Sequence, residues 1–396
     1  MKILFISDVY YPRINGVSTS IKSFKENLEQ LGHDVRLIAP KYNNHLCSEK
    51  WIKRVPSFQV PYDPEDRLMN YFELKKLKKW VESEKFDLIH IHTPFMAHYF
   101  GLNLRKTLSI PCIETYHTFF EDYLHHYIPW LPEKFGRRFA RWVSRRQCNS
   151  VDGVVVPSKP MLDVLTQYGI DKPMSVIPTG IDKHFLTKRN SDVFKLNYQL
   201  PMDKKILLYV GRVAKEKNIE FLLHVVKNIS SEYKDILLLI TGEGPADKDL
   251  NLKIKELGIY EFVKRLPYLD RGNELPQCYS AADVFVFSSK SETQGIVPLE
   301  AMAQGTPVVA IAEMGIKSVI SNNNGALASK DSVKDFSEKV QKLLVNKKFY
   351  EEQSNKAIDY VKNNWTAIKQ VEKVMMFYSE IINNFKKDEL FLLSKT

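Results

Sequence analysis

Glu292 and Glu300 are two carboxylates that lie eight positions apart in the segment SETQGIVPLE. A carboxylate accepts hydrogen bonds from neighbouring hydroxyls, so both side chains suit a ligand that contains ribose or a hexose. A helix that begins near Gly295 would leave Glu292 in the preceding loop and place Glu300 in its second turn, so that the two reach one elongated ligand at different points. The start of this helix, at Gly295 and Ile296, would also offer N–H groups to phosphate oxygens.

The structural alternative for this pair is a surface glutamate in a loop and a second glutamate that is paired with a nearby base. Because Glu300 is flanked by apolar residues, its burial without a partner would be costly, and we expect it to have one. Two carboxylates can also share acid–base work, but the context of this pair favours ligand binding over proton transfer.

Arg212 and Lys217 follow an apolar segment, in GRVAKEKN (211–218). Parallel α/β sheets bind ligands at the carboxyl ends of their strands, and two cations there could neutralise a diphosphate leaving group. The alternative is two solvated basic residues in a loop, but their position at a strand end favours the functional interpretation. Lys215 is a third charge in this loop, which we expect to be solvated.

A glycine also follows the first apolar segment, in NGVS (15–18). Gly16 lets the backbone approach an anion closely, and the helix that follows presents N–H groups and the positive end of its dipole. An ordinary tight loop would look the same, so this signal is weak by itself. The chain contains no GxGxxG, which argues against a nicotinamide or flavin enzyme. Gly242 and Gly244, in GEGP (242–245), are predicted to adopt positive φ angles in a turn.

His117 lies at the end of another apolar segment, in the aromatic and acidic stretch TYHTFFEDYLHHYIP (115–129). A lone histidine is more often a satisfied core residue, but this position favours a hydrogen bond to a sugar hydroxyl, with no general-base role assigned. Further polar residues follow: Glu121, Asp122, His125 and His126. The tandem His125–His126 has no spacing that supports a metal site.

The segment WLPEKFGRRFARWVSRR (130–146) combines aromatic and basic residues. Helical spacing places one apolar face on Phe135, Phe139, Trp142 and Val143, with the basic residues Lys134, Arg137, Arg138, Arg141 and Arg145 around it. An aromatic face with a basic surround suits a helix that lies on anionic lipid. A helix packed on its own domain with a solvated basic face is an equal alternative. The candidate acceptor or membrane residues are Glu121, Asp122, Trp130, Arg137, Arg138, Arg141 and Trp142.

The hydrophobic pattern supplies the elements that must position these residues. Apolar segments typical of buried strands occur at 2–7, 35–40, 86–92, 111–117 and 151–157, and after a turn at 177–182 the pattern restarts at 205–211, 236–242, 283–289 and 306–311. Helical stretches lie between them, which predicts parallel βαβ units with both sheet faces covered. The sequence therefore predicts an α/β protein of two Rossmann-like, doubly wound parallel-sheet domains, facing each other across a cleft that is the natural active site.

Composition limits the classes of function. The chain has 396 residues, 44% of them hydrophobic, and a net charge of +10. No apolar run reaches the ~18 residues of a membrane span, and MKILFIS is too short for a signal peptide, so we expect a cytoplasmic protein. The four cysteines are far apart, which indicates reduced thiols. No nucleic-acid-binding module accompanies the basic residues. DKD (247–249) matches a D-x-D metal signature, but acids at a helix start simply favour the dipole.

Taken together, NGVS, GRVAKEKN, GEGP and above all the E-x7-E spacing of Glu292 and Glu300 resemble retaining glycosyltransferase family 4 over nearly the whole chain. TYHTFFEDYLHHYIP looks like the subgroup that glucosylates diacylglycerol. The resemblance implies a GT-B fold, with an acceptor-binding domain at 1–180 and a nucleotide-sugar-binding domain at 181–370. A C-terminal helix at 371–396 would pack back on the first domain.

The resemblance also implies roles for the candidate residues. Arg212 and Lys217 would hold the diphosphate, with Gly16 against it. Glu300 would bind the nucleotide ribose, Glu292 the hydroxyls of the donor sugar, and His117 would line the donor–acceptor junction. The expected base is uracil. RLPYLD (265–270) departs from many relatives, which have a glycine shortly before the base-binding segment.

The activity so implied is transfer of a hexose, with glucose expected, from a UDP-sugar to a membrane lipid such as diacylglycerol, with retained configuration. It needs no metal and no cofactor, since the nucleotide sugar is a substrate. The expected location is the inner face of the plasma membrane, on an anionic surface. The alternatives are a soluble or polysaccharide acceptor such as lipopolysaccharide or capsule, a nucleotide-sugar epimerase, and a silent sugar-nucleotide binder. The oligomeric state stays open.

Overall fold

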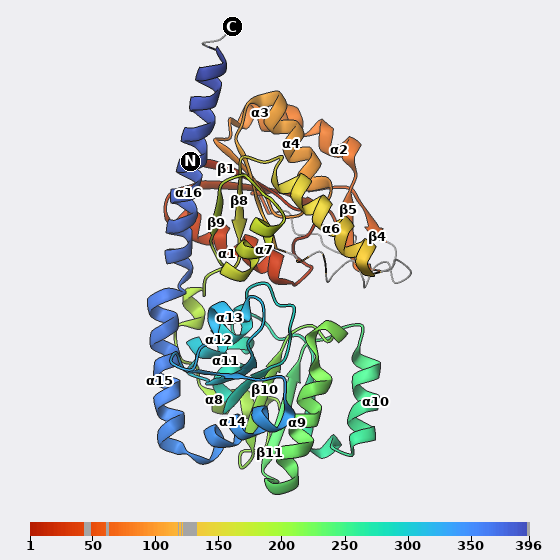
Figure 1. Cartoon of the computed structure of the whole chain (residues 1–396), viewed down its shortest axis with the longest axis vertical. Helices are drawn as coiled ribbons and strands as arrows, with labels where there is room; N and C mark the ends of the chain where they lie inside the picture. The colour runs from red at the N-terminus through yellow and green to blue at the C-terminus, as the bar shows by residue number, and fades with distance from the viewer. Residues whose placement is uncertain (43–48, 61–62, 118, 120, 122–132, 394–396) are drawn as a thin grey trace. The chain divides into compact units, whose positions relative to one another are not determined.

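The computed structural model describes residues 1–42, 49–60, 63–117, 119, 121 and 133–393. The chain divides into two compact units. Unit 1 comprises Met1–Thr179 and Ala367–Thr396, and unit 2 comprises Gly180–Thr366. Each unit contains a parallel sheet with helices against it (Figure 1).

Within the described residues, unit 1 has a seven-stranded sheet in the order β3-β2-β1-β6-β7-β8-β9. Its strands are β1 (Lys2–Ile6), β2 (Asp34–Pro40), β3 (Ile52–Val55), β6 (Leu88–Ile91), β7 (Cys112–Thr115), β8 (Gly153–Val156) and β9 (Met174–Val176). Neighbouring strands are parallel throughout. The chain runs from β1 to β2 and β3 on one side and resumes with β6 on the other, so the topological switch point lies between β1 and β6.

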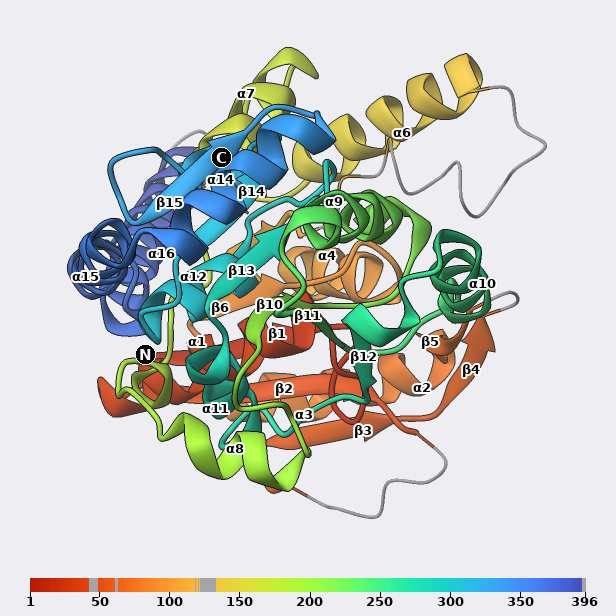
Figure 2. The same cartoon turned by 90° about the horizontal axis from the view of Figure 1, so that it is seen from below.

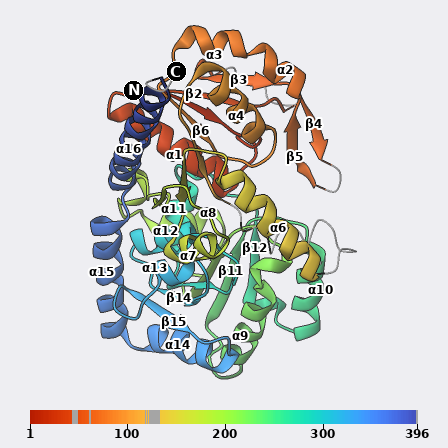
Figure 3. The ribbon, with the colours of Figure 1, turned by 45° about the horizontal axis from the view of Figure 1, so that its top comes forward.

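The described part of unit 1 has the helices α1 (Gly16–Gln30), α2 (Tyr71–Lys76), α3 (Lys78–Glu84), α4 (Met96–Leu108), α6 (Glu133–Cys148), α7 (Lys159–Gln167) and α16 (Ala367–Leu393). An antiparallel pair, β4 (Ser57–Val60) and β5 (Asp63–Met69), extends beside α2 (Figure 3). The sequence pattern did not predict this pair, which lies outside the main sheet.

The C-terminal helix α16 returns to unit 1 and runs beside α1 (Figure 3). Its buried face carries Val371, Val374, Phe377, Tyr378 and Ile381, which join the core formed by β1, β2 and α1. Gly153 in β8 makes room for this helix, because a Cβ there would lie 2.7 Å from Cδ1 of Ile381. Met375 and Ile382 are partly buried against the same core.

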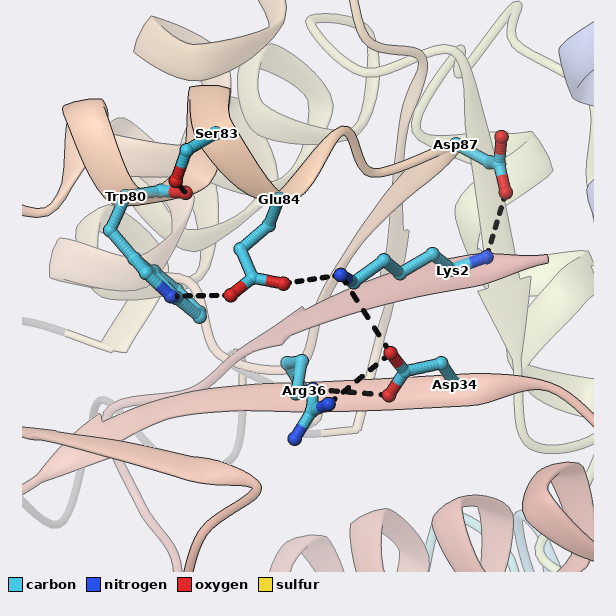
Figure 4. A network of polar contacts seen from close by, with 7 residues as sticks. All are labelled: Lys2, Asp34, Arg36, Trp80, Ser83, Glu84 and Asp87. Carbon is cyan, nitrogen blue, oxygen red and sulfur yellow. Dashed lines mark hydrogen bonds and ion pairs between the residues drawn. The ribbon is translucent and has the colours of Figure 1, made fainter.

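A network of charged side chains lies at the amino ends of β1 and β2 (Figure 4). Lys2 pairs there with Glu84 and lies 3.8 Å from Asp34, while its backbone N–H donates to Asp87 at 2.7 Å. The candidate residues of unit 1 follow the carboxyl ends of the strands, at the opposite end of the sheet. The network therefore anchors α3 to the sheet away from the candidate site.

Unit 2 has, among its described residues, a six-stranded sheet in the order β12-β11-β10-β13-β14-β15. Its strands are β10 (Lys205–Val210), β11 (Ile236–Thr241), β12 (Val263–Leu266), β13 (Val284–Phe287), β14 (Val308–Ile311) and β15 (Ala326–Ser329). All neighbours are parallel, and the switch point lies between β10 and β13. This confirms the predicted α/β class, although the edge strands β12 and β15 were not predicted.

The helices of unit 2 are α8 (Ser191–Asn197), α9 (Ile219–Glu232), α10 (Asp247–Leu257), α11 (Glu274–Ala281), α12 (Ile296–Ala303), α13 (Ile316–Val319), α14 (Val333–Val345) and α15 (Lys347–Asn364). Three short 3-10 helices accompany them: η1 (Lys183–Phe185), η2 (Lys215–Lys217) and η3 (Tyr260–Phe262). Helices α9 and α14 lie side by side (Figure 2). Helix α12 begins beyond β13, next to the switch point.

Candidate functional site

Helix α12 begins where the sequence predicted. Gly295 is its N-cap at φ 88°, in the left-handed region that favours glycine, and no side chain caps this helix end. A Cβ on Gly295 would lie 2.5 Å from Cδ1 of Ile316, so the loop is also tightly packed there. Glu292 lies in the preceding loop, where its carbonyl accepts a hydrogen bond from the N–H of Gly315 at 2.8 Å. Glu300 lies in the second turn of α12.

Glu300 is fully buried and has the partner that its burial requires. Its Oε1 pairs with the guanidinium of Arg271, and its Oε2 accepts a hydrogen bond from the Tyr279 hydroxyl at 2.8 Å. Burial raises the pKa of the Glu300 carboxyl, and Arg271 and Tyr279 both act against that rise. The sequence predicted that a partner exists but did not identify either residue, since they lie 29 and 21 positions before Glu300 in the chain.

Lys217 and Glu292 meet across the switch point of unit 2. The Lys217 Nζ lies 2.6 Å from Glu292 Oε2, and both side chains are about a quarter exposed. The loops that carry them are tied together, because the Ser288 hydroxyl donates to the carbonyl of Asn218 at 2.8 Å and the Asn218 amide donates to the carbonyl of Ser288 at 3.3 Å. The pair therefore joins the loop after β10 to the loop after β13.

Arg212 lies in the same loop as Lys217. Its carbonyl accepts a hydrogen bond from the hydroxyl of Tyr209, at 3.2 Å. Lys215 is exposed as expected and lies 3.7 Å from Asp249. Arg212, Lys217, Glu292 and the start of α12 thus all follow the carboxyl ends of strands in the unit 2 sheet.

Two glycines let the loops after β10 and β11 pack backbone against backbone. Gly242 has φ 122°, and a Cβ on it would lie 2.2 Å from the carbonyl oxygen of Gly211. The prediction of a positive φ at Gly244 is wrong. That residue is constrained by close approach instead, because a Cβ would lie 2.2 Å from the carbonyl oxygen of Val213.

Asp247, in the DKD segment, has a structural role. Its side chain accepts a hydrogen bond from the N–H of Gly244 at 3.0 Å and pairs with Arg265. Across the part of the chain that the structure describes, no group of three or more His, Cys, Asp or Glu residues is arranged to hold a metal ion.

In unit 1, Gly16 is the first residue of α1. Asn15 is the N-cap, and its side chain accepts a hydrogen bond from the N–H of Ser18 at 2.9 Å. An added Cβ on Gly16 would meet nothing within 4 Å, and its φ is not positive. Gly16 therefore leaves open space beside the backbone, which is what a closely approaching ligand requires.

His117 follows β7 and contacts a second histidine. Its Nε2 lies 3.3 Å from Nδ1 of His92, which follows β6, and the two rings stack. His90 in β6 lies next to His92 and bonds to Thr115 and to Tyr378 of α16, each at 2.6 Å. Burial lowers the pKa of His117 to about 4 and the pKa of His90 and His92 well below the ordinary value. All three imidazoles are therefore neutral near pH 7. The sequence missed His92, although its position at the end of an apolar segment matches that of His117.

Glu121 is buried and is held by Arg141. The guanidinium of Arg141 makes a two-point contact with the carboxylate, at 2.5 and 3.2 Å, and the Tyr168 hydroxyl also donates to Glu121. The burial of Glu121 opposes ionisation, and these donors outweigh it, so the pKa of Glu121 is lowered. The other candidates in this stretch, Asp122, Trp130, His125 and His126, lie outside the described residues.

Helix α6 presents its aromatic residues to solvent rather than to its own domain. Phe135 is 69% exposed, Phe139 51% and Trp142 55%. Small residues form the buried face instead: Gly136, Ala140 and Ser144. The basic side chains of Lys134, Arg137, Arg138, Arg141, Arg145 and Arg146 are exposed around the aromatic ones. The buried small residues and the exposed basic side chains agree with the alternative of a helix packed on its own domain with a solvated basic face, and the exposed aromatic residues agree with a helix on anionic lipid. No helix among the described residues is both long and apolar enough to cross a membrane.

Comparisons with known families match both units. The family described as Glycosyltransferase Family 4 matches residues 14–185, and the family described as Glycosyl transferases group 1 matches residues 191–360. The alpha-monoglucosyldiacylglycerol synthase of Streptococcus pneumoniae is 32% identical over 329 residues, which are 81% of this chain and 74% of that protein. The protein of the same name from Acholeplasma laidlawii is 28% identical over 83% of this chain and 86% of its own length.

Other relatives carry different names. A GDP-mannose-dependent alpha-mannosyltransferase of Corynebacterium glutamicum is 26% identical over 96% of this chain and 89% of its own. Among solved structures, the sucrose-phosphate synthase of Thermosynechococcus elongatus has a TM-score of 0.79 at 20% identity, over 97% of this chain and 99% of that one. Anabaena Alr3699/HepE in complex with UDP-glucose has a TM-score of 0.75 at 17% identity, over 96% of this chain and 100% of that one.

Proposed function

Since the chain belongs to glycosyltransferase family 4 and is a glycosyltransferase of the GT-B fold, we propose that it transfers glucose from UDP-glucose to diacylglycerol in a membrane, with retention of configuration. The observation that carries the donor half of this proposal is the ion pair between Lys217 and Glu292 beside the uncapped start of α12. A cation and a carboxylate lie together beside a helix start that no side chain caps, which supports the binding of a nucleotide sugar there.

The donor would lie along the carboxyl edge of the unit 2 sheet. Arg212, Lys217 and the N–H groups at Gly295 and Ile296 would hold the diphosphate. Glu292 would bind the hydroxyls of the glucose, and Glu300 those of the ribose. A solved structure with this fold is a complex with UDP-glucose, which supports a UDP-sugar as the donor.

In the proposed reaction the bond from the anomeric carbon to the diphosphate oxygen breaks as a bond to the acceptor oxygen forms on the same face. Arg212, Lys217 and the α12 N-terminus stabilise the charge that develops on the diphosphate, in the place of a metal ion. The acceptor proton passes to the leaving diphosphate, so no side-chain base is needed. His117 donates or accepts a hydrogen bond at the donor–acceptor junction as a neutral imidazole, because its pKa is lowered to about 4 by burial.

The acceptor half of the proposal rests on α6 and on the relatives. Exposed aromatic side chains among exposed arginines fit the boundary of an anionic membrane, where the rings enter the apolar layer and the guanidinium groups meet phosphate. Two relatives are named alpha-monoglucosyldiacylglycerol synthases. We therefore place the protein on the inner face of the plasma membrane, with the membrane as its partner.

A soluble or polysaccharide acceptor is the second candidate. It is favoured by the solved structure of a sucrose-phosphate synthase, whose name gives a soluble product and which shares this fold over 97% of this chain. The two candidates share the donor site and differ in the need for α6 at a lipid surface.

The experiment that tests the proposal is mass spectrometry of the products formed from UDP-glucose, UDP-galactose and GDP-mannose, each offered with vesicles of diacylglycerol and anionic phospholipid. Glucosyl-diacylglycerol formed from UDP-glucose supports the proposal. Transfer to lipid-free glycans in the absence of vesicles would favour the second candidate.

A further inference from the structure

Glu300, the proposed ribose-binding residue, is enclosed by its own hydrogen-bonding partners. Its side chain is 0% exposed. Of the two groups that bond to it, Tyr279 is fully buried and Arg271 has 24% of its side chain exposed. Arg271 is therefore the partner of Glu300 that solvent reaches.

We propose that Arg271, assisted by Tyr279, is a positioning residue that keeps the Glu300 carboxylate ionised and orients both of its oxygens toward the ribose of the donor. Arg271 thereby sets the preference for ribose over deoxyribose. The inference rests on the proposed ribose role of Glu300. It adds the residues that make that role physically feasible in a buried position.

The first argument is the use of lone pairs. An ionised carboxylate offers about four acceptor positions on its two oxygens. Arg271 occupies one on Oε1 and Tyr279 one on Oε2. One position is thereby left on each oxygen, and two adjacent oxygens with one acceptor position each suit the two hydroxyls of a ribose 2′,3′-diol.

The second argument is charge. A buried carboxylate without a counter-ion becomes protonated, because burial penalises the charged form. Arg271 supplies the counter-ion, and its guanidinium is held in turn over the ring of Phe185, 5.1 Å from the ring centroid. Asp182 opposes the ionisation of Glu300 from the segment that begins unit 2. The charged or titratable groups that act on Glu300 are thus Arg271, Tyr279 and Asp182.

The test compares the binding of UDP and 2′-deoxy-UDP to the full-length protein by calorimetry, at several pH values. The variants are Arg271→Met, which removes the charge at similar length, and Arg271→Lys, which keeps the charge but loses the planar fork. Lys205→Met is the control, because Lys205 pairs with Asp283 at 2.9 Å at the opposite, amino edge of the same sheet.

The wild type is expected to prefer UDP over 2′-deoxy-UDP by about 10-fold to 100-fold, since the site loses a hydrogen bond to the missing hydroxyl. Arg271→Met is expected to bring that ratio near one at neutral pH. In this variant the loss of the counter-ion raises the pKa of Glu300 further. As the pH rises, Glu300 ionises again and the preference for UDP over 2′-deoxy-UDP returns. Arg271→Lys and Lys205→Met should retain most of the preference.

Two results would overturn the inference, and they differ. If Arg271→Met weakens both nucleotides equally and the ratio is unchanged with pH, Arg271 only stabilises the fold. If the wild type does not distinguish the nucleotides and Glu300→Gln binds UDP normally, the ribose role itself is wrong and the inference falls with it. Should Arg271→Met not fold, Tyr279→Phe, which removes only one donor, must lower the preference at least several-fold for the inference to stand.

Discussion

Lys217 and Glu292 form an ion pair, with Nζ and Oε2 2.6 Å apart, although they lie 75 positions apart in the chain. The pair connects the two loops that flank the switch point of the unit 2 sheet, where parallel α/β proteins bind their ligands. It brings the group proposed to neutralise the diphosphate into contact with the group proposed to hold the sugar. The proposed donor site is thus pre-organised around one charge pair, and the proposed roles of its two carboxylates can be separated by substitution.

The first prediction concerns those two carboxylates. Glu300→Ala removes two proposed hydrogen bonds to ribose, so the Kd for UDP should rise about 10-fold to 100-fold. Glu292→Ala removes contacts to the transferred sugar, so kcat should fall about 100-fold while UDP binding changes little. Calorimetry with UDP and initial rates with UDP-glucose provide the two measurements.

Glu338→Ala, at an exposed position of α14, is the control for removal of a carboxylate and should change neither quantity. The reverse pattern, with Glu292→Ala weakening UDP and Glu300→Ala lowering only kcat, would mean that the two roles are interchanged.

The second prediction concerns metal ions. Arg212, Lys217 and the α12 N-terminus are proposed to carry the charge of the leaving diphosphate, which a divalent cation would otherwise do. Activity should therefore persist, within about twofold, after dialysis against EDTA and should not rise when Mg²⁺ or Mn²⁺ is restored. Lys217→Ala should lower kcat sharply under both conditions. Loss of activity in EDTA with recovery in Mg²⁺ would show that these cations are insufficient.

The third prediction is a pH dependence of stability in unit 1. Burial lowers the pKa of His117 to about 4 and also lowers those of His90 and His92. The unfolded chain therefore takes up protons first as the pH falls below the ordinary value of 6.5, and the free energy of unfolding falls between 6.5 and about 4. Asp8 acts in the opposite direction, because burial raises its pKa to about 6.

Comparison with a variant isolates the contribution of one histidine to the pH dependence of stability. His92→Phe removes one buried imidazole, so its Tm should fall less steeply than that of the wild type as the pH is lowered through this window. Thermal unfolding followed by circular dichroism at a series of pH values measures both slopes. Equal slopes would mean that His92 is protonated equally in the folded and unfolded chain.

The fourth prediction concerns α6. Each basic residue near an anionic surface contributes about 1 kcal/mol, so the double variant Arg137→Glu with Arg138→Glu should weaken binding to anionic vesicles at least ~10-fold at low salt. Trp142→Ser should weaken it by loss of apolar insertion, with less dependence on salt. Vesicle sedimentation measures both effects.

Lys347→Glu with Lys348→Glu is a charge-matched control, since both lysines are exposed on α15 of unit 2. Equal losses from the two double variants would indicate that only the net charge matters and that α6 is not the contact surface.

The sequence predicted the elements well where one local pattern determines them. The apolar segments became the central strands, and Gly295 predicted the start of α12 because a left-handed residue at that position favours glycine. The glycine at position 244 was explained wrongly by a positive φ, whereas the structure shows a close approach to Val213. Both causes select glycine, so the sequence alone does not distinguish them.

What the sequence did not reveal depends on contacts between distant segments. The need for a partner at Glu300 followed from its apolar neighbours, but Arg271 and Tyr279 come from another loop and helix. The face of α6 that packs on its domain was also hidden, because an aromatic stripe normally predicts the buried side. Here the small residues Gly136 and Ala140 are buried and Phe139 is exposed.

The most direct test of the central claim is the structure of the product made by the purified protein from UDP-glucose and vesicles of diacylglycerol with anionic lipid, determined by mass spectrometry and NMR. The proposal predicts a monoglucosyl-diacylglycerol with the α configuration of the donor. A β-linked product would contradict retention, and the absence of any glycolipid together with glucose transfer to a soluble acceptor would contradict the membrane acceptor.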